Sequence, residues 1–231
     1  MDVPKHLSLD HATGIHKNET IAQYELGSGK NFVYLILDWA TKKAAMVDPQ
    51  KDLDGMLADL KKYDFELTSI LLTHTHHDHI AGVVPLLKQF PDMILRVGKD
   101  DLHRLPEFAA SAPGLKILSN GEEFQIGQLK VSAHHTPGHS AGEFCYFLKS
   151  PSPYLFTGDT IFIRDCGRTD FSDGSNEEMF QSIQKIKAFP PETVLLVGHH
   201  YAPECSTTLA RELESSPPFR VKSVGELAAL P

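Results

Sequence analysis

The sequence predicts an α/β fold, and two patterns in it support that prediction. Short apolar runs typical of buried strands alternate with segments whose apolar residues recur at three- and four-residue spacing, as on one face of a helix. Several of the apolar runs end in histidine or aspartate, at the position where α/β proteins place their binding sites. A length of 231 residues suits one large domain of this class.

The first half of the chain is expected to alternate between strands and helices. Continuous apolar runs predict the strands, and the helical spacing of Leu53, Met56, Leu57 and Leu60 predicts a helix around them. The expected elements are a strand pair at 31–37 and 44–47, a helix at 52–62, a strand at 69–72, a helix over 83–90, a strand at 93–97 and a short helix at 100–105, followed by a proline-rich loop at 106–114.

The second half is expected to add further strands and one long helix. The expected elements are strands at 124–126 and 129–133, a strand pair at 143–148 and 154–157, a helix at 176–188 that ends before two prolines, and a strand at 194–197. No fixed-period repeat and no linker interrupts this series. We therefore expect a single domain over residues 1–231, with a short C-terminal tail at about 206–231.

The charge balance of the chain disfavours several kinds of partner. Lys and Arg total 22 and Asp and Glu total 30, so the formal net charge is −8, which disfavours a nucleic-acid or an anionic membrane surface as partner. No apolar run comes near the length of about 20 residues that a membrane-spanning helix needs. Residues 1–10 show no apolar core of a secretion signal, residues 1–29 contain no arginine, and the three cysteines are widely spaced. These features favour the cytoplasm.

The segment Thr73–His79, with the sequence THTHHDH, is the strongest functional signal in the chain. It places four histidines and one aspartate within six positions, directly after the apolar run that ends at Leu72. Imidazole nitrogens and carboxylate oxygens are ligands for zinc and iron. Four histidines and an aspartate at one strand end therefore indicate a metal site rather than a loop of solvated side chains.

Three further segments repeat the pattern of an apolar run followed by histidine or aspartate. The segment HHTPGH ends at His139, TGDT contains Asp159, and GHHY contains His199 and His200. A glycine lies within each of these turns, and glycine permits sharp bends and close approach of the backbone to a ligand. If these strand ends meet at one edge of a sheet, their side chains can form a single metal centre.

The set THTHHDH, HTPGHS, FTGDT and GHHY, in that order, resembles the metallo-β-lactamase superfamily and, within it, the glyoxalase II-like branch. The resemblance covers roughly residues 30–205. It implies an αββα sandwich, in which two mixed β-sheets carry helices on their outer faces and the metals lie at one edge. The predicted order of strands and helices agrees with this architecture.

The resemblance implies seven metal ligands and two divalent ions, zinc before iron or manganese. Three histidines hold the first ion, an aspartate and two histidines hold the second, and one further aspartate bridges them. The corresponding residues are His74, His76 and His139 for the first ion, Asp78, His79 and His199 for the second, and Asp159 for the bridge. His199 is favoured over His200 because the family's ligand directly follows the glycine.

The chemistry implied by the resemblance is hydrolysis of a thioester, S-lactoylglutathione above all. Two dications lower the pKa of a shared water to around neutrality, so that a bridging hydroxide can attack the carbonyl carbon. Asp78 and Asp159 are the carboxylates expected to take part in catalysis, and no serine or cysteine nucleophile is required.

Four residues resemble the glutathione-binding positions of glyoxalase II: Arg168 after Cys-Gly, Tyr201 after the metal histidine, and Arg220 and Lys222 near the C-terminus. Basic side chains suit the carboxylates of glutathione. For Arg220 and Lys222, a solvated tail is an equal alternative. The chain also departs from that family branch, because Asp170 stands where an aromatic is usual and the segment after Tyr201 is short.

Other functions within and beyond this branch stay open. Persulfide dioxygenases of the same branch bind a single iron through residues that correspond to His74, His139 and Asp159, but they carry alanine at the position of His77. A metallohydrolase of another small ester and a non-catalytic metal-binding module are further alternatives.

Overall fold

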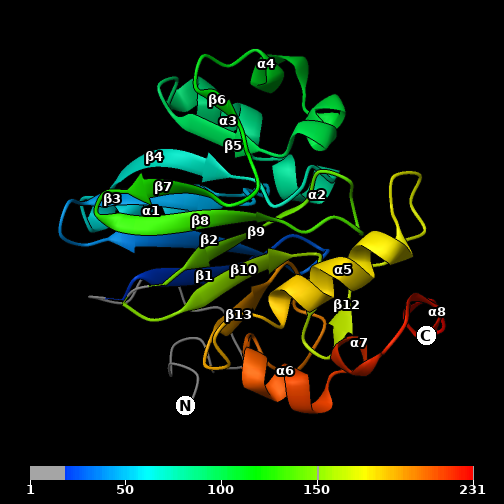
Figure 1. Ribbon diagram of the computed structural model, residues 1–231. Helices are drawn as coiled ribbons and strands as arrows, with labels where there is room; N and C mark the ends of the chain where they lie inside the picture. Colours follow the sequence, from blue (N-terminus) through cyan, green and yellow to red (C-terminus); the bar gives the residue numbers. More distant parts are fainter. Residues whose placement is uncertain (1–18, 150, 231) are drawn as a thin grey trace.

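Two six-stranded β-sheets pack face to face and carry helices on their outer sides (Figure 1). The computed structural model describes residues 19–149 and 151–230. Both sheets are mixed, since each contains parallel and antiparallel pairs. The predicted αββα sandwich is therefore confirmed.

The first sheet follows the order of the chain. Its first three strands are antiparallel, and the remaining strands continue parallel to the third. The strands are β1 (Ile21–Leu26), β2 (Asn31–Asp38), β3 (Lys43–Val47), β4 (Glu66–Leu71), β5 (Ile94–Val97) and β6 (Leu115–Ile117).

The second sheet has the order β14-β13-β10-β9-β8-β7, and its one parallel pair is β10 with β13. A small ribbon of β11 (Ile161–Phe162) and β12 (Asp165–Cys166) follows β10. The strands of the sheet are β7 (Glu122–Ile126), β8 (Leu129–His135), β9 (Phe144–Leu148), β10 (Tyr154–Gly158), β13 (Val194–Val197) and β14 (Thr207–Thr208).

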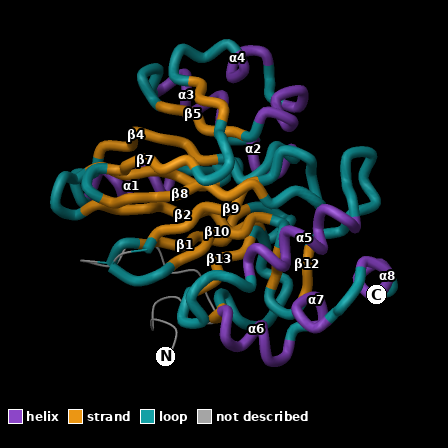
Figure 2. The backbone as a smooth tube through the Cα atoms, viewed as in Figure 1, coloured by secondary structure: helices purple, strands orange, loops and turns teal. Residues whose placement is uncertain are grey.

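The helices form the two outer layers. Helices α1 (Asp54–Lys62), α3 (Val83–Gln89) and α4 (Glu107–Ala110) cover the first sheet, whereas α5 (Asn176–Ile186), α6 (Leu209–Ser215), α7 (Pro217–Arg220) and α8 (Val224–Ala228) cover the second. Figure 2 shows α5–α8 gathered on one side and α3 and α4 on the opposite side. The short helix α2 (His77–Ile80) and the 3₁₀ helix Lys99–Arg104 lie in connections. Every helix of the described ranges is too short or too polar to span a bilayer.

Strand β2 lies between two apolar layers, and this position explains why its sequence is apolar at nearly every position. Phe32 and Tyr34 face the core between the two sheets, whereas Val33 and Leu35 face the layer under the helices. All eight of its residues are buried. A strand buried on both faces has no polar side, so its sequence is continuously apolar rather than alternating.

The structure confirms the main predicted strands and helices and adds several that were not predicted. Strand β1 precedes the first predicted strand, and α4 lies inside the expected loop at 106–114. Both elements are short or lie at a sheet edge, where tertiary contacts decide the conformation more than the local sequence pattern does.

Residues 206–231, for which the sequence predicts a short tail, contain β14, α6, α7 and α8 in their described part. Leu209, Phe219 and Leu227 from these helices are buried against α5 and the second sheet. The apolar residues of this segment are spread over helices of four to seven residues, too short to show a clear helical period.

We expect Leu35→Ala to lower the free energy of unfolding by about 2–5 kcal/mol, because Leu35 is fully buried and the substitution leaves a cavity. The matched control Leu213→Ala makes the same change in a side chain that is 37% exposed on α6, and its cost should stay below about 1 kcal/mol. Urea unfolding of both variants measures the difference. Equal losses would contradict the layer assignment.

Candidate metal centre

The polar ends of four strands meet at one edge of the sandwich. β8, β10 and β13 all run in the same direction, because β8 and β10 are both antiparallel to β9 and β13 is parallel to β10. Their C-terminal ends therefore lie at the same edge, where they meet the histidine-rich segment after β4. The side chains that approach one another come from these loops: His74, His76, Asp78 and His79 after β4, His139 after β8, Asp159 after β10 and His199 after β13.

Three histidines form the first cluster. His74, His76 and His139 each offer one ring nitrogen, and the three nitrogens lie within 4.8 Å of one another. His139 Nε2 and His76 Nδ1 are only 2.9 Å apart. Nitrogens at this spacing can bind one ion jointly.

A second cluster consists of Asp78, His79 and His199, whose ligand atoms also lie within 4.8 Å of one another. His79 Nε2 is 3.1 Å from His199 Nε2, and Asp78 Oδ2 is 3.4 Å from the same nitrogen of His199. His200, the alternative to His199, turns away, and its Nδ1 lies 2.5 Å from the carboxylate of Glu25.

Asp159 lies between the two clusters. Its Oδ2 is 3.5 Å from His139 Nε2 and 3.4 Å from His199 Nε2, so a single carboxylate oxygen approaches both groups. Its Oδ1 lies 3.5 Å from His79 Nε2. The close packing depends on Gly198, because a Cβ atom at that position would be 2.1 Å from Asp159 Oδ1.

The donor set fits a pair of divalent ions. Among the described residues, His74 Nε2 and Asp159 Oδ1 are fully buried without a hydrogen-bond partner. A buried polar atom without a partner costs free energy unless something else satisfies it. His74 Nε2 lies 4.0 Å from Asp159 Oδ2, and Asp159 Oδ1 lies 3.5 Å from His79 Nε2, so a cation held among these side chains would satisfy both atoms. Imidazole and carboxylate donors suit zinc, iron and manganese.

Four of the histidines are oriented by partners on their outer side. The Nδ1–H of His79 donates to Asp48 Oδ2 at 3.0 Å, and the Nδ1–H groups of His139 and His199 donate to the carbonyls of Arg168 and Gly29, both at 2.8 Å. His74 Nδ1 is 3.1 Å from Thr73 Oγ1. Such partners at Nδ1 direct the Nε2 atom of each ring into the site, as metal ligation requires.

The pKa values of the site separate its histidines into two kinds. Burial and the neighbouring imidazoles lower the pKa of His76 to about 4 and that of His74 well below its usual value. Burial also acts to lower the pKa of His79, but the carboxylates of Asp159 and Asp48 outweigh it and raise this pKa to about 9. Burial acts to raise the pKa of Asp159, yet the imidazoles of His79, His199 and His74 lower it far below its usual value.

Comparison with known proteins identifies the family. Residues 26–199 match the family model described as the metallo-beta-lactamase superfamily. The chain belongs to the metallo-β-lactamase superfamily. This confirms the resemblance that the motifs predict, and it agrees with the sandwich and with the location of the candidate metal centre at its edge.

Several named proteins are similar to this chain. A probable polyketide biosynthesis zinc-dependent hydrolase, BaeB from Bacillus velezensis, is 32% identical over 93% of this chain and 91% of its own length. A hydroxyacylglutathione hydrolase from Cronobacter sakazakii is 36% identical over 74% of this chain but only 62% of its own length. The crystal structure of ETHE1 from Myxococcus xanthus has a TM-score of 0.79 and 28% identity, covering 91% of this chain and 92% of that protein.

Two exposed aromatic rings flank the clusters of this superfamily member. Tyr201 is 64% exposed and stacks on His199, with ring centroids 4.7 Å apart. On the other side, the ring of Phe171 lies 4.9 Å from His76 and 5.3 Å from His139. Tyr201 was predicted from the sequence as a substrate residue, whereas Phe171 was not.

Of the three basic residues predicted to bind substrate, Arg168 lies beside an aromatic ring that contacts the first cluster, whereas Arg220 and Lys222 lie near the end of α7. The Arg168 guanidinium lies 4.7 Å from the Phe171 ring and forms a two-pronged ion pair with Asp170, at 2.5 and 2.6 Å. Arg220 and Lys222 are exposed at and just after the end of α7. Within residues 19–149 and 151–230, the structure records no contact between either of their side chains and the seven clustered residues.

Asp48 was also not predicted from the sequence. It follows β3 directly, and its carboxylate accepts hydrogen bonds from the Thr73 backbone N–H at 2.8 Å and from the Thr73 hydroxyl at 2.6 Å. It also accepts a hydrogen bond from His79. The same signal that identified the other loops, a carboxylate at the end of an apolar run, is present at Val47-Asp48. It could have been found by applying that rule to every strand.

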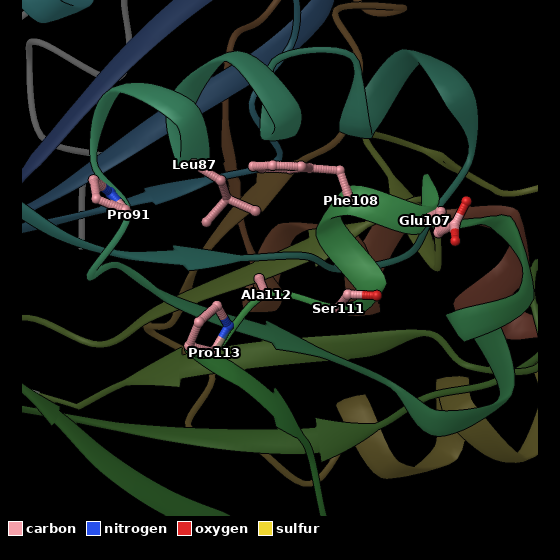
Figure 3. A pocket seen from close by; sticks show the side chains of 7 residues that line it. All are labelled: Leu87, Pro91, Glu107, Phe108, Ser111, Ala112 and Pro113. Carbon is pink, nitrogen blue, oxygen red and sulfur yellow. The ribbon is translucent and has the colours of Figure 1, made fainter.

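A separate apolar cavity of about 460 Å³ lies beside α3 and α4, away from the candidate metal centre (Figure 3). Its lining includes Leu87, Pro91, Phe108 and Pro113, and Glu107 is its one ionisable residue. Without imidazoles or a second carboxylate, this cavity lacks the groups for metal chemistry.

Metal uptake by this superfamily member should release a proton from His79. In the metal-free protein the pKa of about 9 keeps His79 protonated at neutral pH, and coordination through Nε2 requires its loss. We therefore expect the affinity for an ion at Asp78, His79 and His199 to rise by about tenfold per pH unit between about pH 6 and 8, and to level off above the pKa of His79. Calorimetric zinc titration in buffers with different heats of protonation counts the released protons. No proton release over that range would contradict the assignment.

Proposed function

We propose that the chain is a dinuclear metal-dependent hydrolase that cleaves a small-molecule thioester, with an S-acylglutathione such as S-lactoylglutathione as the leading candidate substrate. The observation that carries this proposal is the position of Asp159, whose carboxylate approaches ligand atoms of both clusters. Membership of the metallo-β-lactamase superfamily and the similarity to named hydrolases support it.

One ion would be held by His74, His76 and His139 and the other by Asp78, His79 and His199, with Asp159 placed between the two sets to serve both. When bound, two divalent ions supply Lewis acidity and lower the pKa of a shared water to around neutrality. The chain's own contribution is to present neutral imidazoles from His74 and His76 and an ionised carboxylate from Asp159 at neutral pH. Zinc is the proposed metal, since the relative BaeB is described as zinc-dependent.

The thioester would enter between Tyr201 and Phe171. These rings stand over His199 on one side and over His76 and His139 on the other, so the carbonyl group of a bound substrate can reach the space between the clusters. Aromatic walls suit the apolar parts of an acyl chain and the sulfur of a thioester. Arg168 is the nearest candidate to bind a carboxylate of the thiol portion.

Two observations bear on the choice of thiol. The hydroxyacylglutathione hydrolase relative supports glutathione, yet this chain spans 62% of that protein's length. The BaeB relative is matched over 91% of its length and is named for polyketide biosynthesis, which favours a different thiol carrier. A thioester of another small or carrier-bound thiol is therefore the nearest alternative substrate for the same site.

A mononuclear iron persulfide dioxygenase is the second candidate function. His74 Nε2 and His139 Nε2 lie 4.0 and 3.5 Å from Asp159 Oδ2, an arrangement of two histidines and one carboxylate that suits a single iron. The second cluster of Asp78, His79 and His199 has no role in that arrangement, and its presence favours the hydrolase.

Metal analysis with two assays tests the proposal directly. We expect two zinc ions per chain and hydrolysis of S-lactoylglutathione, followed as loss of the thioester absorbance. Asp159→Ala should keep the chain folded, as measured by circular dichroism, and lower kcat by about 10³-fold or more, because a carboxylate shared by both clusters is removed. One iron per chain with oxygen uptake on glutathione persulfide would instead establish the dioxygenase.

Asp170 should restrain the use of anionic substrates through its ion pair with Arg168. Asp170→Asn frees the guanidinium, so kcat/KM for S-lactoylglutathione should rise by about two- to fivefold, the range expected for an exposed ion pair. An uncharged thioester of N-acetylcysteamine should be hydrolysed at an unchanged rate. The matched control is Asp165→Asn, which removes the charge of an exposed aspartate in the neighbouring strand β12; the Arg168 guanidinium pairs with Asp170 instead. Equal gains with both substrates would show that Arg168 binds no substrate carboxylate.

A further inference from the structure

The side-chain amide of Asn31, at the start of β2, contacts the second cluster from its outer side. Asn31 is 1% exposed, and its Nδ2 donates to Asp78 Oδ2 at 2.9 Å and to the Asp78 backbone carbonyl at 3.3 Å. The same nitrogen lies 3.5 Å from His79 Nε2. The donated hydrogen bond reaches the same carboxylate oxygen that faces His79 and His199.

Asp78 needs such a partner more than the other residues of its cluster do. The side chains of His79 and His199 are 0% and 4% exposed, whereas that of Asp78 is 44% exposed. Packing therefore restricts the two imidazoles but leaves the carboxylate free to rotate toward solvent. A directed hydrogen bond is the remaining means of holding Asp78 Oδ2 near the two histidine nitrogens.

Gln50 fixes which way the Asn31 amide points. Gln50 is also buried, and its Nε2 donates to Asn31 Oδ1 at 3.3 Å. Its own Oε1 is occupied, because the Lys51 backbone N–H donates to it at 2.7 Å. If the Asn31 amide were turned over, its Oδ1 would face the Asp78 carboxylate, and its Nδ2 would face the Gln50 Nε2, another donor. Both contacts are unfavourable, so one orientation of the amide is selected.

The backbone of the same segment holds His199. Asn31 forms an isolated antiparallel bridge with His199, and the Phe32 N–H donates to the Gly198 carbonyl at 2.8 Å. The Nδ1–H of His199 donates to the Gly29 carbonyl at 2.8 Å. A side chain at Gly29 would also crowd the amide, since its Cβ would lie 2.8 Å from Asn31 Oδ1.

From these contacts we infer that Asn31, with its amide oriented by Gln50, is a positioning residue that holds Asp78 for the second metal ion. Its backbone contacts tie His199 to the same place, so one segment aligns two of the three ligands of the cluster. The first cluster does not depend on this amide. The inference rests on the proposed two-metal function and specifies which outer residues decide whether the second position is filled.

Cobalt(II) titration followed by visible absorption, with a chelator competition for affinities, tests the inference without using activity. We expect wild type to take two equivalents. In Asn31→Ala the second equivalent should bind about 10–100-fold more weakly, the usual effect of losing a ligand-orienting partner, and the first should be unchanged. Asn120→Ala makes the same change at an exposed asparagine that contacts the His135 backbone, and it should keep both equivalents.

Gln50→Glu tests the amide orientation while keeping Asn31 itself. A carboxylate at position 50 accepts but cannot donate, so the Asn31 amide should turn and oppose Asp78, which weakens the second equivalent as in Asn31→Ala. An unchanged second equivalent in Asn31→Ala would overturn the inference. So would parallel weakening of both equivalents together with a lowered Tm, since that result shows a role in folding alone. A single equivalent in wild type would instead refute the two-metal function.

Discussion

The whole site depends on one buried carboxylate that is surrounded by imidazoles. Asp159 is 6% exposed, and ring nitrogens of His74, His79, His139 and His199 lie within 3.4–4.0 Å of its oxygens. An isolated buried charge is costly, so the carboxylate stays ionised only because these positive or polarisable partners are fixed around it. The Asp159 backbone N–H donates to the buried Glu143 at 2.8 Å, which secures the loop from behind. The two sheets serve to bring the four supporting loops to this one point.

Outer hydrogen bonds convert that convergence into a defined set of ligand directions. Asp48, the Arg168 carbonyl and the Gly29 carbonyl each occupy an Nδ1 position, so the opposite nitrogen of each ring faces inward. These partners lie on β-strand ends and short connections that the sheets hold rigidly. Rigid support matters because metal ligation tolerates only small errors in ligand placement. The fold thus sets the directions in which these ring nitrogens point.

The sequence allowed the architecture and the inner residues of the centre to be predicted, because both leave strong local patterns. Buried strands such as β2 are continuous apolar runs, and the ligand loops follow them as dense polar motifs. Residues that act from outside leave weaker patterns. Asn31 lies within an apolar strand and Phe171 in a loop, and only the packing of distant segments brings them to Asp78 and His139. The C-terminal helices were missed for the same reason, since their burial depends on α5 and the second sheet.

The residues of the candidate metal centre lie apart from the exposed side chains that would select the substrate. Five of the seven inner residues are buried, and all seven come from connections that follow strands, so a change there disturbs the candidate metal centre and its supporting hydrogen bonds. The side chains beside the two clusters, Tyr201, Phe171 and the Arg168–Asp170 pair, are exposed and can change without altering the sheets. Two relatives of similar sequence are named as a hydroxyacylglutathione hydrolase and as a probable polyketide biosynthesis zinc-dependent hydrolase. Under the proposed function, the ion pair of Arg168 with Asp170 leaves the aromatic rings as the main exposed surface beside the clusters, so contact with apolar parts of a substrate would contribute more to binding than charge.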